Sequence, residues 1–189
     1  MSINLQKGQK IKLGKTNVTV GLGWTPNEGT GKTYDLDCSV FLLNDVRMIP
    51  SDDNFIFYNN KKSPDGAVTH TGDNLTGDGE GDDEQIIVDV TKLNDKIKEI
   101  LFVVTINDCQ TKAQNFGQIK NAYIRIVDNV TQTEIAKFDL GEDFSIETAV
   151  EFGKLYEKDG EWKFDATGIG YNEDLGFFVS KYSTAQVLK

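Results

Sequence analysis

The amino-acid sequence predicts an all-β protein in which two antiparallel sheets pack face to face as a β-sandwich, with a few short helices. Its apolar residues fall in short segments that mostly alternate with polar residues, as strands with one buried face do. Turn residues separate the segments: Asp159-Gly160 is a hairpin signal, and Ser63-Pro64-Asp65-Gly66 suits a tight turn. Many short strands with little helix are typical of two packed sheets.

The strands are expected where apolar residues alternate or run together. The continuously apolar segment Ile100–Ile106 is typical of a strand covered on both faces, so we expect it at the centre of a sheet. The full set of expected strands is Lys10–Leu13, Val18–Trp24, Tyr34–Leu43, Phe55–Tyr58, Gln85–Val90, Ile100–Asn107, Ala122–Val127, Thr133–Leu140, Val150–Tyr156 and Glu161–Ala166.

Two segments have the spacing of short helices. In Thr91–Ile97 two apolar residues stand four positions apart, and in Glu173–Lys181 three apolar residues share one face. No linker or repeat divides the 189 residues, so we predict a single domain over residues 1–183 and a frayed tail over 184–189.

The composition limits location and partners. A formal net charge of −10 argues against nucleic acid, because gripping a phosphate backbone needs clustered Lys and Arg, and it favours cations instead. The sequence shows neither a signal peptide nor a transmembrane segment, so a cytoplasmic protein is expected, with peripheral membrane association left open. Cys38 and Cys109 are expected to be buried reduced thiols, and a lone His70 argues against zinc sites and histidine-dependent catalysis.

The segment Gly72–Glu84 (GDNLTGDGEGDDE) concentrates carboxylates and glycines, and no Lys or Arg occurs between Lys62 and Lys92. Either the segment is a solvated acidic loop, or it surrounds a cation. Glycines permit the tight backbone that turns carbonyl groups inward, and calcium takes six to eight oxygen ligands. Soft ligands are missing, so zinc and copper do not fit, and the segment lacks the residue pattern of an EF-hand.

A second acidic group lies in the strand expected over Tyr34–Leu43. Its alternation places Asp35, Asp37 and Ser39 on one face, opposite an apolar face. Either this face lies at an exposed strand end, or its carboxylates face a metal ion. The polar pair Asn107-Asp108 ends the apolar Ile100 strand and could reach the same place.

Several motifs together resemble the TerD-type proteins of bacterial tellurite resistance and general stress. The acidic segment Gly72–Glu84 is the most specific of these motifs, and the resemblance covers almost the whole chain. The other motifs are Asp35–Leu43 (DLDCSVFLL), Phe57–Asn59 (FYN), Ser63–Gly66 (SPDG), Phe102–Ile106 (FVVTI), Asn115–Gln118 (NFGQ), Asn121–Arg125 (NAYIR) and Gly160–Phe164 (GEWKF).

The resemblance implies a cytoplasmic calcium-binding β-sandwich without enzymatic activity, holding more than one calcium ion. It implies that Thr76, Gly77 and Gly79 act through carbonyl oxygens or loop shape. It also implies unidentified protein partners, among which paralogous stress proteins are expected. The side-chain ligands that it implies are Asp73, Asn74, Asp82, Asp83 and Glu84 from the loop, with Asp35 and Asp37 from the strand.

Three functions remain open from the sequence. The first is a stress-response or tellurium-resistance module whose binding surface is organised by calcium. The second is a calcium-bridged binder of an anionic ligand, either a nucleotide or a lipid head group. The third is a metal-dependent phosphoester hydrolase, against which stand the single histidine and the absence of a phosphate-binding Gly-Lys loop.

Overall fold

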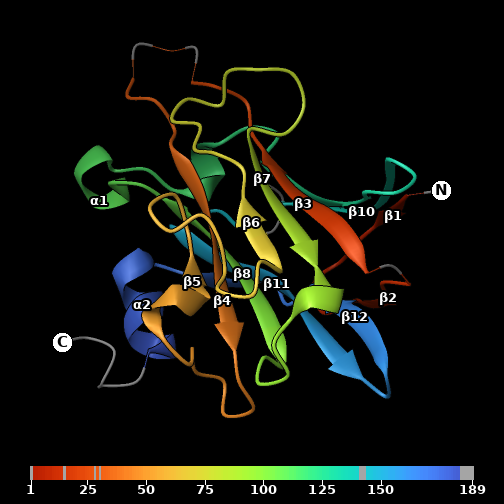
Figure 1. Ribbon diagram of the computed structural model, residues 1–189. Coiled ribbons are helices and arrows are strands. Elements are labelled where there is room, and N and C mark those ends of the chain that lie inside the picture. The colour runs from red at the N-terminus through yellow and green to blue at the C-terminus, as the bar shows by residue number, and fades with distance from the viewer. Residues whose placement is uncertain (1, 15, 28, 30, 141–143, 184–189) are drawn as a thin grey trace.

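The structure is a computed structural model, and it describes residues 2–14, 16–27, 29, 31–140 and 144–183. It consists of two sheets packed face to face (Figure 1), so the predicted all-β sandwich is confirmed. The expected tail at 184–189 lies outside the described residues. Within the described residues, no helix is long and apolar enough to cross a membrane.

The first sheet has the strand order β1-β10-β9-β3-β7-β6, and its pairs are antiparallel except for the parallel pair of β1 and β10. Strand β9 alternates between half-buried and buried residues, which is typical of a sheet with one face in solvent. The strands are β1 (Ile3–Asn4), β3 (Asn17–Gly23), β6 (Val68–His70), β7 (Glu84–Asp89), β9 (Tyr123–Asp128) and β10 (Thr133–Asp139).

The second sheet has the order β2-β12-β11-β8-β4-β5, and β13 pairs with β11 beside this path. Its strands are β2 (Lys10–Lys12), β4 (Leu36–Leu43), β5 (Phe55–Ile56), β8 (Glu99–Ile106), β11 (Ala149–Lys158), β12 (Glu161–Asp165) and β13 (Ile169–Tyr171). As predicted, the apolar strand β8 lies centrally, between β11 and β4, and every residue of β4 and β8 is buried.

Burial on both faces of the second sheet has two sources. Its inner face packs against the first sheet through residues such as Val40 and Phe102. Its outer face carries Phe41 and Val103, which pack beneath Phe178 of helix α2 (Leu175–Tyr182). This helix confirms the predicted helix at Glu173–Lys181, and Figure 1 shows it lying on the outer side of β4 and β5.

The short-range predictions have mixed outcomes. Asp159 and Gly160 form the predicted hairpin between β11 and β12, both with positive φ, and Gly66 N donates to Ser63 O across the predicted turn. The helix predicted over Thr91–Ile97 is wrong, because a 3₁₀ turn at Val90–Lys92 is followed by a separate turn, in which Ile97 N donates to Asn94 O. The remaining helical turns are α1 (Cys109–Lys112) and 3₁₀ turns at Asp52–Asn54, Val90–Lys92 and Phe116–Gln118.

Candidate metal centre

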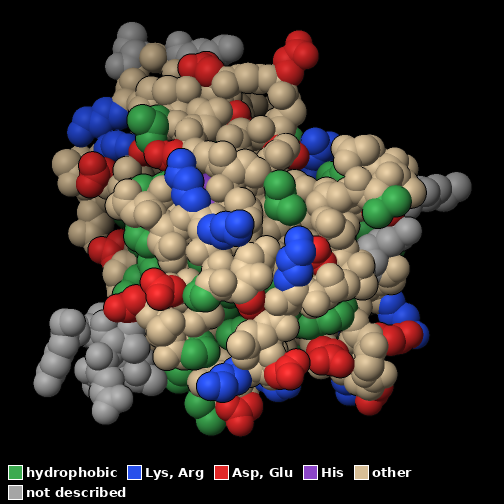
Figure 2. Space-filling model, viewed as in Figure 1, with side chains coloured by type: hydrophobic (Ala, Val, Ile, Leu, Met, Phe, Trp, Pro, Cys, Tyr) green, Lys and Arg blue, Asp and Glu red, His purple; other side chains and the backbone are tan. Residues whose placement is uncertain are grey.

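The acidic segment forms the long connection between β6 and β7, at the end of the sandwich where β4 begins (Figure 1). Figure 2, in the same view, shows some Asp and Glu side chains at this end of the molecule and others at the opposite end. The segment therefore lies where the acidic start of β4 can meet it, although the two are far apart in the sequence.

Asp35 and Asp37 are buried at the start of β4, with only 6% and 7% of their surfaces exposed. Alternation along the strand behaves as predicted, because Leu36 and Cys38 point into the core between the sheets. The structure does not support the alternative of an exposed strand end. Asn107 reaches the same place, as expected from the sequence, and its Nδ2 donates to Asp35 Oδ2 at 2.9 Å.

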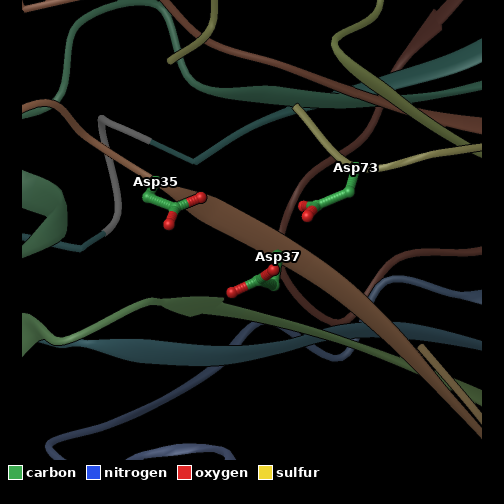
Figure 3. A group of neighbouring side chains, drawn as sticks. All are labelled: Asp35, Asp37 and Asp73. Carbon is green, nitrogen blue, oxygen red and sulfur yellow. The ribbon is translucent and has the colours of Figure 1, made fainter. Parts of the chain in front are cut away.

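Asp73 completes a cluster of three carboxylates. One oxygen from each of Asp35, Asp37 and Asp73 lies within 4.8 Å of the others. Figure 3 shows that Asp35 and Asp37 project from one strand and that the carboxylate of Asp73 is directed toward them from the loop. We call these three residues the carboxylate cluster.

The electrostatics of the cluster are those of uncompensated negative charge. Burial raises the pKa of Asp37 to about 8, and the nearby charges of Glu84, Asp35 and Asp73 add to this effect. Lys112 has the opposite influence on the pKa but does not cancel the shift. At neutral pH a carboxyl group with such a pKa is largely protonated, and a bound cation would favour its charged form.

Glu84 lies beside the cluster at the start of β7 and spans the space between the two sheets. Its Oε2 accepts a hydrogen bond from Cys38 N at 2.7 Å and lies 3.7 Å from His70 Nε2. His70 is itself buried, and its Nδ1 accepts from Gly72 N at 3.2 Å, which leaves the proton on Nε2. Burial raises the pKa of Glu84, although His70 and the backbone N–H of Cys38 act in the opposite direction.

Asn74 and Asp83 brace the loop through hydrogen bonds. Asn74 Oδ1 accepts from Thr76 N at 3.1 Å and from Gly77 N at 3.0 Å, an arrangement that holds the turn. Asn74 Nδ2 donates to Asp83 Oδ1 at 3.1 Å, and Asp83 Oδ2 accepts from Trp24 N at 2.9 Å. These side chains shape the loop around the cluster, and their oxygens lie outside the group of three carboxylates.

Two positions in the loop, Gly77 and Gly79, require glycine for different reasons. Gly77 has φ of +75°, and a Cβ atom there would lie 2.4 Å from Trp24 Nε1, so the indole requires glycine at this position. Gly79 has φ of +152° and open space around it, so its requirement is conformational. Both observations support a role of these glycines in loop shape.

Asp82 faces away from the cluster and onto the outer side of the first sheet. Arg125 of β9 binds it through two hydrogen bonds, Nε to Oδ1 at 2.7 Å and Nη2 to Oδ2 at 3.1 Å. The Tyr123 hydroxyl also donates to Asp82 Oδ1, at 3.1 Å. Gly21 makes room for this carboxylate, because a Cβ atom there would lie 2.2 Å from Asp82 Oδ2.

Sequence reasoning missed Arg125, since the absence of Lys and Arg near the loop suggested that nothing neutralises its charges. The sequence carried only a weak signal for the contact between Arg125 and Asp82. Alternation in β9 places Tyr123 and Arg125 on the solvent-facing side of the first sheet. That side comes to lie near Asp82 only because β9 and β7, which follows Asp82 in the chain, both pair with β3.

The residues of this site fit a hard divalent cation. Asp35 Oδ1 and Glu84 Oε1 are buried and accept no hydrogen bond from the described part of the chain. Buried carboxylate oxygens without partners are costly, and a bound ion removes that cost. Because the donors are oxygens from several carboxylates, calcium suits them better than zinc or copper.

Fold and site together define a β-sandwich protein in which two buried carboxylates of one strand meet an exposed carboxylate of an acidic, glycine-containing loop. The chain belongs to the TerD domain family, whose pattern matches residues 1–182. It is 49% identical over 188 residues to general stress protein 16U of Bacillus subtilis, covering 96% of this chain and 97% of that protein. It is 48% identical over 187 residues to tellurium resistance protein TerD of Serratia marcescens, with the same coverage of 96% and 97%.

A solved structure shows the same fold. The crystal structure of a homologue of telluride resistance protein (TerD) from Streptomyces coelicolor A3(2) superposes with a TM-score of 0.74 at 20% identity, covering 87% of this chain and 95% of that chain. The resemblance to TerD-type proteins that the motifs indicated is thus confirmed at the level of family and fold.

Proposed function

We propose that this protein is a calcium-binding module of the tellurium-resistance and general-stress family. One observation carries the proposal: Asp35, Asp37 and Asp73 place carboxylate oxygens within 4.8 Å of one another, with no basic partner for them among the described residues. Without a cation, mutual repulsion opposes the ionisation of all three carboxyl groups at the start of β4. A calcium ion converts that repulsion into attraction and ties the loop to β4.

Asp35, Asp37 and Asp73 would hold the first ion, and Glu84 Oε1, which accepts no hydrogen bond from the described residues, would be available as a further ligand. The proposal includes more than one ion, as the resemblance to TerD-type proteins implies. Asp82 belongs to the ion pair with Arg125 and serves to anchor the loop. Asn74, Asp83 and the glycines set the shape of the loop.

The ordered loop would present a surface to a protein partner, a role consistent with its exposed Leu75. The relatives named for tellurium resistance and general stress support a place in a stress response, with paralogous family members as candidate partners. We propose a cytoplasmic location and assign no catalysis to the domain.

Isothermal titration of calcium into protein stripped of metal tests the proposal and reports stoichiometry and affinity together. We expect saturable binding that Asp73→Asn abolishes or weakens by at least tenfold. Asp95→Asn is the matched control, because Asp95 is an exposed carboxylate in the turn before β8. Absence of calcium binding by the unaltered chain, or equal losses in the two variants, would overturn the proposal.

Thermal unfolding supplies a second measurement. An ion that binds only the folded protein stabilises it by about 2.7 kcal/mol when free calcium is a hundred times Kd. The melting temperature should therefore rise with calcium in the unaltered protein and in Asp95→Asn. In Asp73→Asn, the addition of calcium should leave the melting temperature unchanged.

A further inference from the structure

The carboxylate cluster is assembled from two parts of the chain, and the separation between these parts sets the geometry of the site. Asp35 and Asp37 stand on β4, whereas Asp73 comes from the loop between β6 and β7 (Figure 3). The groups of a functional site have to be held to within about 0.5 Å by the residues that support them. A residue that contacts both parts is therefore a candidate for positioning the cluster.

Trp24 holds the backbone on the β4 side of the cluster. This residue follows β3 directly, and 5% of its surface is exposed. Its indole Nε1 donates to Tyr34 O at 3.3 Å, and this carbonyl group belongs to the peptide bond that leads into Asp35. The main-chain oxygen of Asp35 accepts from Asn107 N at 2.8 Å, so the backbone of Asp35 is held from both sides.

Trp24 also holds the acidic loop. Its main-chain N donates to Asp83 Oδ2 at 2.9 Å, and its indole lies against Gly77, where a Cβ atom would be 2.4 Å from Nε1. Asn74, which follows Asp73 in the chain, joins these two contacts to the cluster. Its Nδ2 donates to Asp83 Oδ1 at 3.1 Å, and its Oδ1 accepts from Gly77 N at 3.0 Å. The position of the loop is thus tied to one tryptophan.

We propose that Trp24 is a positioning residue whose side chain fixes the separation between the two parts of the carboxylate cluster. The alternative is that the tryptophan only fills space, because it belongs to the core between the sheets. Any large apolar side chain would serve that purpose. The bond to Tyr34 O, by contrast, needs the indole N–H, and the close contact with Gly77 is made by the same edge of the ring.

The consequence for the metal site concerns the size of the ion, and this part rests on the proposed function. Magnesium binds oxygen ligands at about 2.0 to 2.1 Å and calcium at about 2.3 to 2.6 Å, so magnesium requires the ligands to move closer together. Two parts of the chain that are held by a buried indole resist this contraction, whereas a loosened pair can contract. Trp24 should therefore favour calcium over magnesium.

The test compares Trp24→Phe with Val18→Ala in calorimetric titrations of calcium and of magnesium. Phenylalanine keeps a ring in the core but lacks the Nε1 donor. Trp24→Phe should weaken calcium binding about threefold to tenfold, less than the loss of about 10- to 100-fold that is typical for a residue bonded directly to a ligand, and should lower the ratio of calcium to magnesium affinity. Val18 is buried near the other end of β3, so Val18→Ala should reduce stability and leave both affinities unchanged.

Amide hydrogen exchange in the metal-free protein tests the positioning role without any ion. The amides of Thr76 and Gly77, which bond to Asn74 Oδ1, should exchange faster in Trp24→Phe than in the unaltered protein. Val18→Ala should leave the exchange of these amides unchanged, because they exchange through local opening of the loop.

The outcomes separate this inference from the calcium proposal. Unchanged calcium affinity in Trp24→Phe would overturn the positioning role and leave the calcium proposal standing. Equal losses of calcium affinity in Trp24→Phe and Val18→Ala would show that only core packing matters, which also overturns the positioning role. If the unaltered protein binds no calcium, the calcium proposal fails and amide exchange decides the rest: faster exchange in Trp24→Phe supports the positioning role, and unchanged exchange overturns it.

Discussion

Replacing Arg125 with glutamine tests whether Asp82 anchors the loop or holds an ion. The Asp82 side chain is 2% exposed and makes two hydrogen bonds to the guanidinium, at 2.7 and 3.1 Å. Without Arg125, the carboxylate keeps only the neutral donors Tyr123 and Gln85, at 3.1 and 3.3 Å. A buried negative charge is then left without its cation.

The expected loss of stability is intermediate. Removing one partner of a fully buried ion pair costs about 3 to 5 kcal/mol. The Arg125 side chain is 31% exposed, so solvent screens the pair, and the two remaining donors compensate part of the loss. We therefore expect Arg125→Gln to lower the free energy of unfolding by about 2 kcal/mol.

The assay is urea unfolding of the metal-free protein, with Asp82→Asn and the double variant completing a mutant cycle. The coupling between the two positions should be about 1 to 2 kcal/mol. Calcium stoichiometry, measured by calorimetry, should stay the same in Arg125→Gln. A loss below about 0.5 kcal/mol with no coupling would contradict the anchoring role. Loss of an ion without loss of stability would show instead that Asp82 is a ligand.

Three further outcomes follow from the loop and the cluster. Asp73→Asn should raise the melting temperature of the metal-free protein, because it removes a repelling charge, and should abolish the rise caused by calcium. The pKa of Asp37 is raised from 3.8 to about 8, so the folded state holds its proton more tightly, and metal-free stability should fall as pH rises from about 4 to about 8. Asp37→Asn should flatten this slope in urea unfolding measured across that pH range. Gly77→Ala should cost about 1 to 3 kcal/mol and change the fluorescence of Trp24, because φ is +75° and the new Cβ meets the indole.

Strand positions and turns were predictable because both depend on neighbouring residues. The alternation around Asp37 and the apolar run of β8 correctly indicated faces and burial, and Asp159-Gly160 correctly marked a hairpin. The helix expected at Thr91–Ile97 failed because spacing over so short a segment is weak support for a helix, and the chain leaves its 3₁₀ turn to enter β8. The short strands β1, β6 and β13 carry too few residues for a periodic signal.

The sequence by itself determined that acidic and amide oxygens would gather in one glycine-containing loop and at the start of one strand. Only the tertiary structure decided which of them share a site: Asp73 joins Asp35 and Asp37, whereas Asp82 turns to Arg125. The physical reason is that alternation and turn preference act between neighbours in the chain. Strand pairing, by contrast, brings together side chains that are separated by dozens of residues, and these contacts determine whether a carboxylate meets an arginine or other carboxylates.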